Sequence, residues 1–346
     1  MRRLFILLFL AVGVALFFLA VVPSNTEVSR LALVPEAADA RSVDTKPIQI
    51  LFTGDVMLDR GVAAHAIQKG DDSIILGVQE LFSSVDAVVI NIEGTITTNP
   101  SVAMPNHDDL RFTFDPRFAA WLKDIGVTVV SLSNNHTDDF GMAGLEETKI
   151  LLRSVGIAYF GSPFNDSDLS TKITVQNKTL CFVGYEGFIS TDPAPIAAEI
   201  ARLRPECAFL AATMHAGEEY QPTYTTLQQT AAHAFIDAGA DVVIGTHPHV
   251  VEPLEIYKDK AIFYSLGNFI FDQDFSFATE HGIAVRATWE DEKTQYVLIP
   301  ITIQGSEVKV THDEETAKRT LTSLINEQVP PDIATAILST HSFMLP

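Results

Sequence analysis

The stretch Val243-Ile-Gly-Thr-His-Pro-His-Val250 decides the fold that we expect for this chain. The apolar run 242–244 predicts a buried strand, and His247 and His249 follow its end. Side chains two residues apart point the same way in an extended segment, and Pro248 biases His247 toward extended geometry. We therefore expect both imidazoles just past a strand end, where open α/β sheets bind ligands. Imidazole is the commonest side-chain metal ligand; a surface loop with two titrating histidines is the alternative.

The composition limits the classes of function. Of the 346 residues, 47% are hydrophobic and 19% are charged, which is enough core for one large domain or two modest ones. A formal net charge of −21 argues against nucleic acid as a partner, because its phosphates would be repelled. Cys181 and Cys207 lie in apolar runs and lack the spacing of a thiolate metal site. We expect two buried free thiols, with one disulfide as the alternative.

An apolar run near the N-terminus predicts a membrane anchor over residues 1–22. Residues 4–22 carry no charge and would form about 28 Å of helix, close to the ~30 Å hydrocarbon core of a lipid bilayer. Arg2 and Arg3 precede the run, so we expect a single-pass protein of the cell membrane with a cytoplasmic N-terminus. No cleavage site follows closely, although a cleaved signal peptide is the alternative. Both interpretations place the bulk of the chain outside the cytoplasm.

The remaining chain divides by pattern into three parts. Residues 23–46 are rich in Pro, Ser and Ala without periodicity and predict a tether. Residues 47–312 predict the globular domain, because strand and helix patterns alternate there as in an α/β fold. Within it, hairpin patterns make the expected β-sheets mixed, and residues 261–271 predict one strand interrupted by a bulge or a close backbone approach at Gly267. Residues 313–346 predict a helical tail.

Residues of metal-binding type follow five of the expected strands. They are Asp55; Asn91 and Glu93; Asn134, Asn135 and His136; His215; and His247 with His249. Each of these taken alone could be a turn residue or a helix cap. Together, their position after apolar runs predicts that they converge at one rim of the sheets. Imidazole, carboxylate and amide oxygen suit Zn²⁺, Mn²⁺ or Fe better than Ca²⁺ or a thiolate site.

Six segments form an ordered set over roughly residues 48–275. They are Thr53-Gly-Asp-Val-Met-Leu58, Asn91-Ile-Glu-Gly94, Ser133-Asn-Asn-His136, His215-Ala-Gly-Glu-Glu-Tyr220, Gly245-Thr-His-Pro-His249 and Tyr264-Ser-Leu-Gly-Asn-Phe269. This set resembles the CapA (PgsA) capsule synthesis family, which is associated with poly-γ-glutamate and belongs to the calcineurin-like metallophosphatase superfamily. The resemblance implies a four-layer αββα sandwich with two metals at the strand ends.

The resemblance also implies roles for individual residues. Two divalent metal ions, Mn, Zn or Fe, would be held by Asp55, Glu93, Asn135, His215, His247 and His249, with Glu93 as the bridging carboxylate. His136 would protonate a leaving group or stabilise an oxyanion. Contacts to substrate are expected from Asn91, Arg60, Arg111, Asn134, Glu219 and Asn268. Met57 stands where the wider superfamily has a metal-binding histidine, so one ligand is missing.

Two functions are expected from this resemblance. The first is a membrane-anchored, extracytoplasmic protein of capsule or poly-γ-glutamate synthesis, with metal-dependent, phosphoesterase-like hydrolase chemistry. Its partners would be a cell-envelope polymer such as poly-γ-glutamate or a phosphoester substrate, other membrane proteins of capsule synthesis, and the lipid bilayer through residues 4–22. The alternative is a non-enzymatic component of capsule-polymer assembly or export with a vestigial metal site, which Met57 and the anchor favour. A general phosphatase for small exported substrates is a third possibility.

Overall fold

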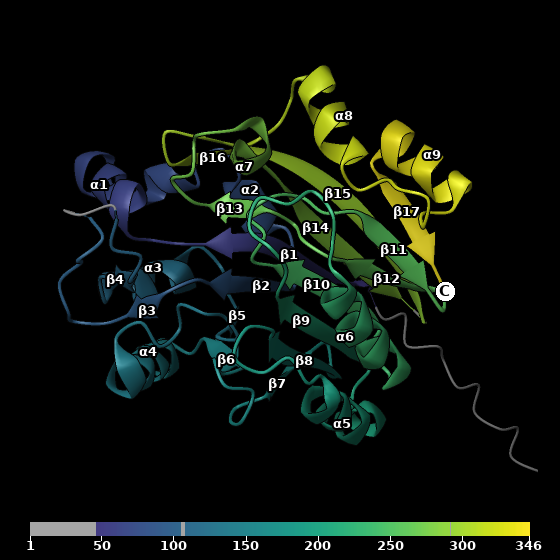
Figure 1. Cartoon of the computed structure of the whole chain (residues 1–346), viewed down its shortest axis with the longest axis horizontal. Coiled ribbons are helices and arrows are strands. Elements are labelled where there is room, and N and C mark those ends of the chain that lie inside the picture. Colours follow the sequence, from purple (N-terminus) through teal and green to yellow (C-terminus); the bar gives the residue numbers. More distant parts are fainter. Residues whose placement is uncertain (1–45, 105–107, 291) are drawn as a thin grey trace, which may run out of the picture. The chain divides into compact units, whose positions relative to one another are not determined.

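The computed structural model describes residues 46–104, 108–290 and 292–346, and it contains two large β-sheets (Figure 1). The first sheet has the order β16-β15-β14-β1-β2-β5-β6, with β13 beside β1 and β17 beside β15. Its strands are β1 (Ile48–Val56), β2 (Ala87–Ile92), β5 (Val129–Ser131), β6 (Ala158–Phe160), β13 (Asn268–Ile270), β14 (His281–Glu290), β15 (Lys293–Gln304), β16 (Glu307–Val310) and β17 (Ser342–Leu345).

The second sheet has the order β11-β12-β10-β9-β8-β7. Its strands are β7 (Ser170–Val175), β8 (Lys178–Glu186), β9 (Phe209–His215), β10 (Val242–Thr246), β11 (Leu254–Tyr257) and β12 (Lys260–Phe263), and a separate small sheet pairs β3 (Thr95–Ile96) with β4 (Thr113–Phe114). Both large sheets combine parallel pairs such as β1–β2 and β9–β10 with antiparallel hairpins such as β14–β15 and β7–β8. The fold is therefore a mixed α/β fold.

Side chains of the central strands alternate between the two faces of each sheet, so sheets and helices pack in layers. In β1, Ile50 and Phe52 share a hydrophobic cluster with Phe209 of β9, so the two sheets pack face to face. Leu51 of β1 points the other way, as the two-residue repeat of a strand requires. It packs in a cluster formed with helices on the outer face of the first sheet, and Leu210 does the same on the outer face of the second. The order of layers is helix, sheet, sheet, helix.

Two groups of helices cover the outer faces of the two sheets (Figure 1). The cluster on the first sheet draws on α1 (Arg60–Lys69), α2 (Gln79–Ser83), α3 (Arg117–Asp124) and α4 (Gly141–Ser154), and the short helix η1 (Asp71–Ile74) also contributes. The cluster on the second sheet draws on α5 (Ala194–Leu203) and α6 (Thr226–Asp237). The remaining helices are η2 (Arg204–Glu206), α7 (Phe277–Glu280), α8 (Glu314–Thr322) and α9 (Pro331–Thr340).

The C-terminal segment 313–346 is part of the sandwich. It contains the helices α8 and α9, and Leu321 and Ile337 from these helices join the cluster between the two sheets. It ends in β17, which pairs antiparallel with β15. The expected anchor (1–22) and all of the expected tether (23–46) except Lys46 lie outside the described residues. Among the residues that the structure describes, no helix combines the length and the apolarity needed to cross a membrane.

Two local expectations were wrong. Residues 261–271 are not one strand: β12 belongs to the second sheet and β13 to the first, so the chain crosses between sheets at Gly267. The expected close backbone approach is confirmed there, because the Gly267 carbonyl accepts a hydrogen bond from the Asp55 N–H at 3.1 Å. The cysteines are not free thiols: Cys181 and Cys207 form a disulfide with their Cα atoms 5.8 Å apart. The pairing of β8 with β9, which the sequence does not reveal, brings them together.

Candidate metal centre

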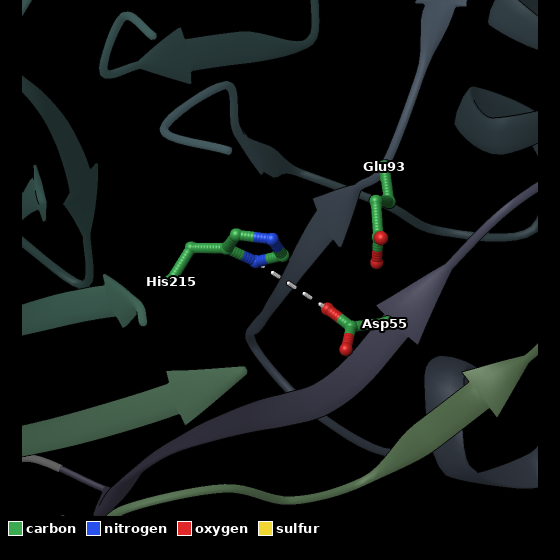
Figure 2. A group of neighbouring side chains, drawn as sticks. All are labelled: Asp55, Glu93 and His215. Carbon is green, nitrogen blue, oxygen red and sulfur yellow. Dashed lines mark ion pairs between the residues drawn. The ribbon is translucent and has the colours of Figure 1, made fainter. Parts of the chain in front are cut away.

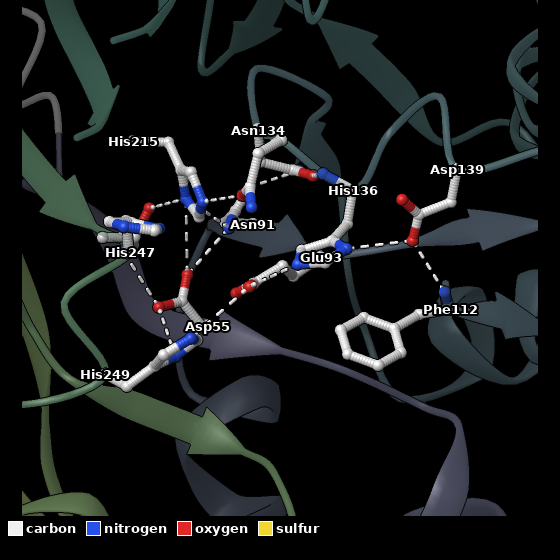
Figure 3. Close-up of polar contacts among 12 residues, drawn as sticks. Asp55, Asn91, Glu93, Phe112, Asn134, His136, Asp139, His215, His247 and His249 are labelled. Atoms are coloured by element: carbon white, nitrogen blue, oxygen red, sulfur yellow. Dashed lines mark hydrogen bonds and ion pairs between the residues drawn. The ribbon is translucent and has the colours of Figure 1, made fainter. Parts of the chain in front are cut away.

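Ligand-type side chains meet where parallel strands of both sheets end (Figure 3). Asp55 of β1 lies in register with Asn91 of β2 and Asn268 of β13, and His215 of β9 lies in register with Thr246 of β10. The side chains of Asp55, Glu93 and His215 offer ligand atoms that all lie within 4.8 Å of one another, and all three residues are buried (Figure 2). The strand ends thus concentrate two carboxylates and an imidazole at one point.

Asp55 lies at the middle of this group. Its Oδ1 accepts a hydrogen bond from Asn91 Nδ2 at 2.8 Å and lies 3.8 Å from His215 Nδ1. Its Oδ2 accepts from the backbone N–H of His247 at 3.0 Å and lies 3.6 Å from His249 Nδ1. Burial alone would raise the pKa of Asp55, but the neighbouring histidines outweigh burial and hold this pKa far below its usual value. Asp55 is therefore a permanent negative charge.

Glu93 follows the end of β2 and is 1% exposed. Among the described residues, neither carboxylate oxygen has a hydrogen-bond partner. Its Oε1 lies 3.6 Å from His249 Nε2 and 3.8 Å from His136 Nε2. Burial and the charge of Asp55 raise the pKa of Glu93 to about 8. Burial lowers the pKa of His249, but Glu93 and Asp55 outweigh it and raise that pKa to about 9. Buried carboxylate oxygens without partners are rare in proteins, and a cation would satisfy them.

His215 and His247 face each other across the same point, with ring centroids 4.9 Å apart. His215 Nε2 lies 2.8 Å from Asn135 Oδ1, and its Nδ1 lies 2.9 Å from Thr246 Oγ1. His247 Nδ1 is buried without a partner. Burial lowers the pKa of both histidines, that of His247 to about 3. Both rings are therefore neutral, which is the form that binds metal.

The backbone that presents the histidine pair is not extended, and here the expectation from Pro248 was wrong. His247 has φ of 99° and His249 has φ of 59°, both in the left-handed region that residues with a side chain seldom adopt. Their ring centroids are still only 6.0 Å apart. The hydrogen bond from the His247 N–H to Asp55 stabilises this turn, and such conformations cluster at functional sites.

His136 is oriented by a carboxylate that the sequence analysis missed. Its Nδ1 lies 2.9 Å from Asp139 Oδ2, and this oxygen also accepts a hydrogen bond from the Phe112 N–H at 2.7 Å. The Phe112 ring lies against the imidazole, with centroids 4.5 Å apart. Burial lowers the pKa of His136, but Asp139 and Glu93 outweigh burial, so this pKa is raised. The only signal in the sequence was an acidic residue three positions after the histidine.

Several known proteins are similar in sequence to this chain. A family model described as "Bacterial capsule synthesis protein PGA_cap" matches residues 49–273. The chain belongs to this family. It is 31% identical over 242 residues to "PGA biosynthesis protein CapA" of Bacillus subtilis (strain 168), which covers 65% of this chain and 63% of the relative, so the chain spans less than two thirds of that relative.

A second relative and a solved structure show similar proteins. "Capsule biosynthesis protein CapA" of Bacillus anthracis is 28% identical over 298 residues, which covers 79% of this chain and 72% of the relative. A crystal structure of a putative 5'-nucleotidase from Staphylococcus aureus in complex with alpha-ketoglutarate has a TM-score of 0.45 and 11% identity, covering 86% of this chain and 58% of that one. The family assignment rests on the sequence matches alone.

Three of the residues expected to touch substrate lie behind the ligand-type side chains in this member of the capsule synthesis family. Asn134 donates from Nδ2 to Asn91 Oδ1 at 3.0 Å, and its Oδ1 accepts from the His136 N–H at 3.1 Å. Asn268 Oδ1 lies 2.9 Å from His249 Nδ1. Asn91, Asn134 and Asn268 are all buried. The structure thus places these amides as supports that fix the rings and carboxylates.

The other three expected substrate residues lie near the surface. Arg60 and Glu219 line a pocket of about 230 Å³ that also reaches Glu93, His136 and His249. Arg111 does not line this pocket and is paired with Asp109 at 2.7 Å.

Met57 also lies away from the ligand group. Its side chain is fully buried in the hydrophobic cluster beneath α1, and its sulfur accepts from the Asp59 N–H at 3.0 Å. The position that the wider superfamily fills with histidine is therefore part of the core here.

Proposed function

We propose that this capsule synthesis protein binds divalent metal ions, Mn, Zn or Fe, between its two sheets and uses them to hydrolyse a bond in a cell-envelope polymer such as poly-γ-glutamate or in a phosphoester. One observation carries the proposal: Asp55, Glu93 and His215 offer ligand atoms within 4.8 Å of one another. Both Glu93 oxygens and His247 Nδ1 are buried without partners, so the donor set fits a cation of this class.

The chain's own residues prepare this chemistry. When bound, the ions would supply a Lewis acid and lower the pKa of water. Asp55 provides a permanent negative charge that would hold a cation, and Glu93 would add a second once its proton is displaced. His215 and His247 are neutral donors for which no proton competes. Asp139 holds His136 Nδ1, so Nε2 is the atom that gives a proton to a leaving group or stabilises negative charge.

Location outside the cytoplasm is part of the proposal. The apolar residues 4–22 would anchor the chain in the cell membrane, with other membrane proteins of capsule synthesis as neighbours. The Cys181–Cys207 disulfide supports an extracytoplasmic domain, because such bonds persist in oxidising compartments. Protease added to intact cells should digest the domain. The mass of the purified protein then distinguishes an uncleaved anchor from a cleaved signal peptide.

Met57 favours a second candidate function. With no histidine at this position, one of the two metal ions would lose a ligand, and the centre would hold a single ion or serve a structural role. The protein would then act in assembly or export of the capsule polymer without catalysis. Metal bound without turnover of any phosphoester or γ-glutamyl substrate would support this alternative.

Metal analysis and turnover together test the proposal. The purified full chain should retain Mn, Zn or Fe, and His247→Ala should retain clearly less, whereas His312→Ala, at an exposed histidine, should match the wild type. With metal supplied, phosphoesters and γ-glutamyl polymers should include a substrate whose turnover His136→Ala abolishes. Equal metal content in the wild type and His247→Ala would refute the metal centre.

A further inference from the structure

The pocket beside the metal centre has a lining that the metal chemistry does not explain. It holds about 230 Å³, which is room for one compact group and not for a coiled polymer. One side consists of Glu93, His136 and His249. The rest combines the polar side chains of Arg60, Glu219, Asp272 and Gln273 with a set of apolar and aromatic ones from widely separated segments, namely Leu110, Phe112, Tyr220, Phe271 and Phe275.

The outer wall of the pocket exposes apolar rings to solvent. Phe275 is 62% exposed, Tyr220 is 42% exposed, and their rings meet nearly at right angles with centroids 5.2 Å apart. Tyr220 also lies over His249, with centroids 5.9 Å apart, and Gln273 Nε2 donates to its hydroxyl at 3.0 Å. Apolar side chains gathered at one exposed place are costly in water and mark a binding surface.

On the inner wall, the guanidinium of Arg60 packs against two aromatic rings. The guanidinium carbon of Arg60 lies 4.9 Å from the centroid of Phe112 and 5.6 Å from that of Phe271. Arg60 is also paired with Asp272, so its charge is already compensated. A guanidinium plane beside aromatic faces is a surface on which flat groups stack.

The charge of the pocket disfavours a polyanion. Its lining combines the carboxyl groups of Glu93, Glu219 and Asp272 with Arg60, His136 and His249. Each of these three basic side chains already lies beside a carboxylate, that of Asp272, Asp139 and Asp55 respectively. A run of glutamate residues would therefore find no row of unpaired cations along this pocket. The apolar walls therefore have to receive an uncharged part of the ligand.

We propose that this pocket binds a planar, apolar ring of the substrate, attached to a small oxyanion that the metal centre holds, and does not bind a stretch of polyanion. The inference deepens the proposed function and rests on it for the oxyanion. Substrates of this class are phosphomonoesters and related small anions that carry an aromatic group next to the scissile bond.

Calorimetric titration of the Mn²⁺-loaded full chain with non-hydrolysable phosphonates tests the pocket. Phenylphosphonate should bind about 10-fold more tightly than methylphosphonate, which is the scale of one good aromatic contact. Butylphosphonate should fall well below phenylphosphonate, because it is apolar without being flat. In Tyr220→Ala/Phe275→Ala the preference for phenyl over methyl should fall to about 1-fold. Leu76→Ala/Ile150→Ala removes two other exposed apolar side chains and should keep the preference.

A second measurement separates failure of the pocket from failure of the metal centre. Saturation-transfer NMR of the metal-free chain with benzyl alcohol should show contact of its ring protons in the wild type and in Leu76→Ala/Ile150→Ala. This signal should be lost in Tyr220→Ala/Phe275→Ala. Equal affinities for the three phosphonates, or an NMR signal that survives the loss of both rings, would overturn the proposal. Absence of bound Mn²⁺ would refute the proposed function, and the NMR result would still decide the pocket.

Discussion

Metal binding to this centre should strengthen steeply as the pH rises from 6 to 8. A metal ion has to displace any proton on its ligands, so each ligand protonated in the free protein weakens binding. Burial and Asp55 raise the pKa of Glu93 to about 8, and Glu93 and Asp55 outweigh burial to raise that of His249 to about 9. The pair of Glu93 and His249 therefore holds at least one proton at pH 7. His215 and His247 do not, because burial lowers the pKa of both.

These values set the size of the effect. At pH 7 the proton that Glu93 and His249 share opposes binding by about two pH units, about 2.7 kcal/mol or ~10² in affinity. Competition with a fluorescent chelator at pH 6, 7 and 8 measures the Mn²⁺ affinity of the metal-stripped full chain. We expect a rise of roughly 10²-fold over this range.

A matched pair of variants locates the protons. Glu93→Gln keeps the shape of the side chain but has no proton to displace. The Mn²⁺ affinity of this variant should be lower at every pH, and its rise between pH 6 and 8 should be at least ~10-fold smaller than in the wild type. His312→Ala should follow the wild type. An affinity that is flat between pH 6 and 8, or a pH dependence unchanged in Glu93→Gln, would refute this account of the centre.

Three further predictions concern the residues around the centre and the stability of the fold. Asp139→Asn should lower kcat about 10²-fold with unchanged metal content, because His136 loses the partner of its Nδ1; metal loss in step with activity would contradict this. Burial raises the pKa of Glu252 to about 8, so the folded chain keeps a proton that the unfolded chain releases near pH 4.5. Stability should therefore fall by about 4 kcal/mol from pH 5 to 9 in urea unfolding, and by much less in Glu252→Gln. Replacing Cys181 and Cys207 by Ala should lower the free energy of unfolding by about 3.5 kcal/mol for a sequence separation of 26, and unchanged urea midpoints with and without reductant would show that the disulfide contributes nothing.

The residues at the strand ends were the part of the site that could be predicted from the sequence. An apolar run followed by Asp55, Glu93 or His215 is a local pattern, and parallel strands carry such ends to one rim. The structure brings these residues together with His247 and His249. The mixed sheets and the two hairpins were also local patterns, because hydrophobic alternation and turn residues lie close together in the chain.

Features that depend on pairing between segments far apart in the sequence could not be predicted from it. The disulfide depends on how β8 aligns with β9, and the split between β12 and β13 depends on which sheet accepts each strand. The left-handed backbone at His247 follows from a hydrogen bond to Asp55, 192 positions away. Asp139 lacks an apolar run before it, so nothing local distinguished it from a turn residue.

The last quarter of the chain completes the sheet that the first strand begins. β1 lies between β2 on one side and β14 on the other, while β13 joins its end and β15, β16 and β17 extend the edge. A fragment that stops at residue 273, where the family match ends, would leave the backbone of β1 open along one side. A chain emerging N-terminus first, from a ribosome or through a membrane, can pair β1 with β2 early, but the other edge of β1 stays unpaired until β14 arrives. Delayed assembly and exposure of this edge to proteases are therefore inherent features of this topology.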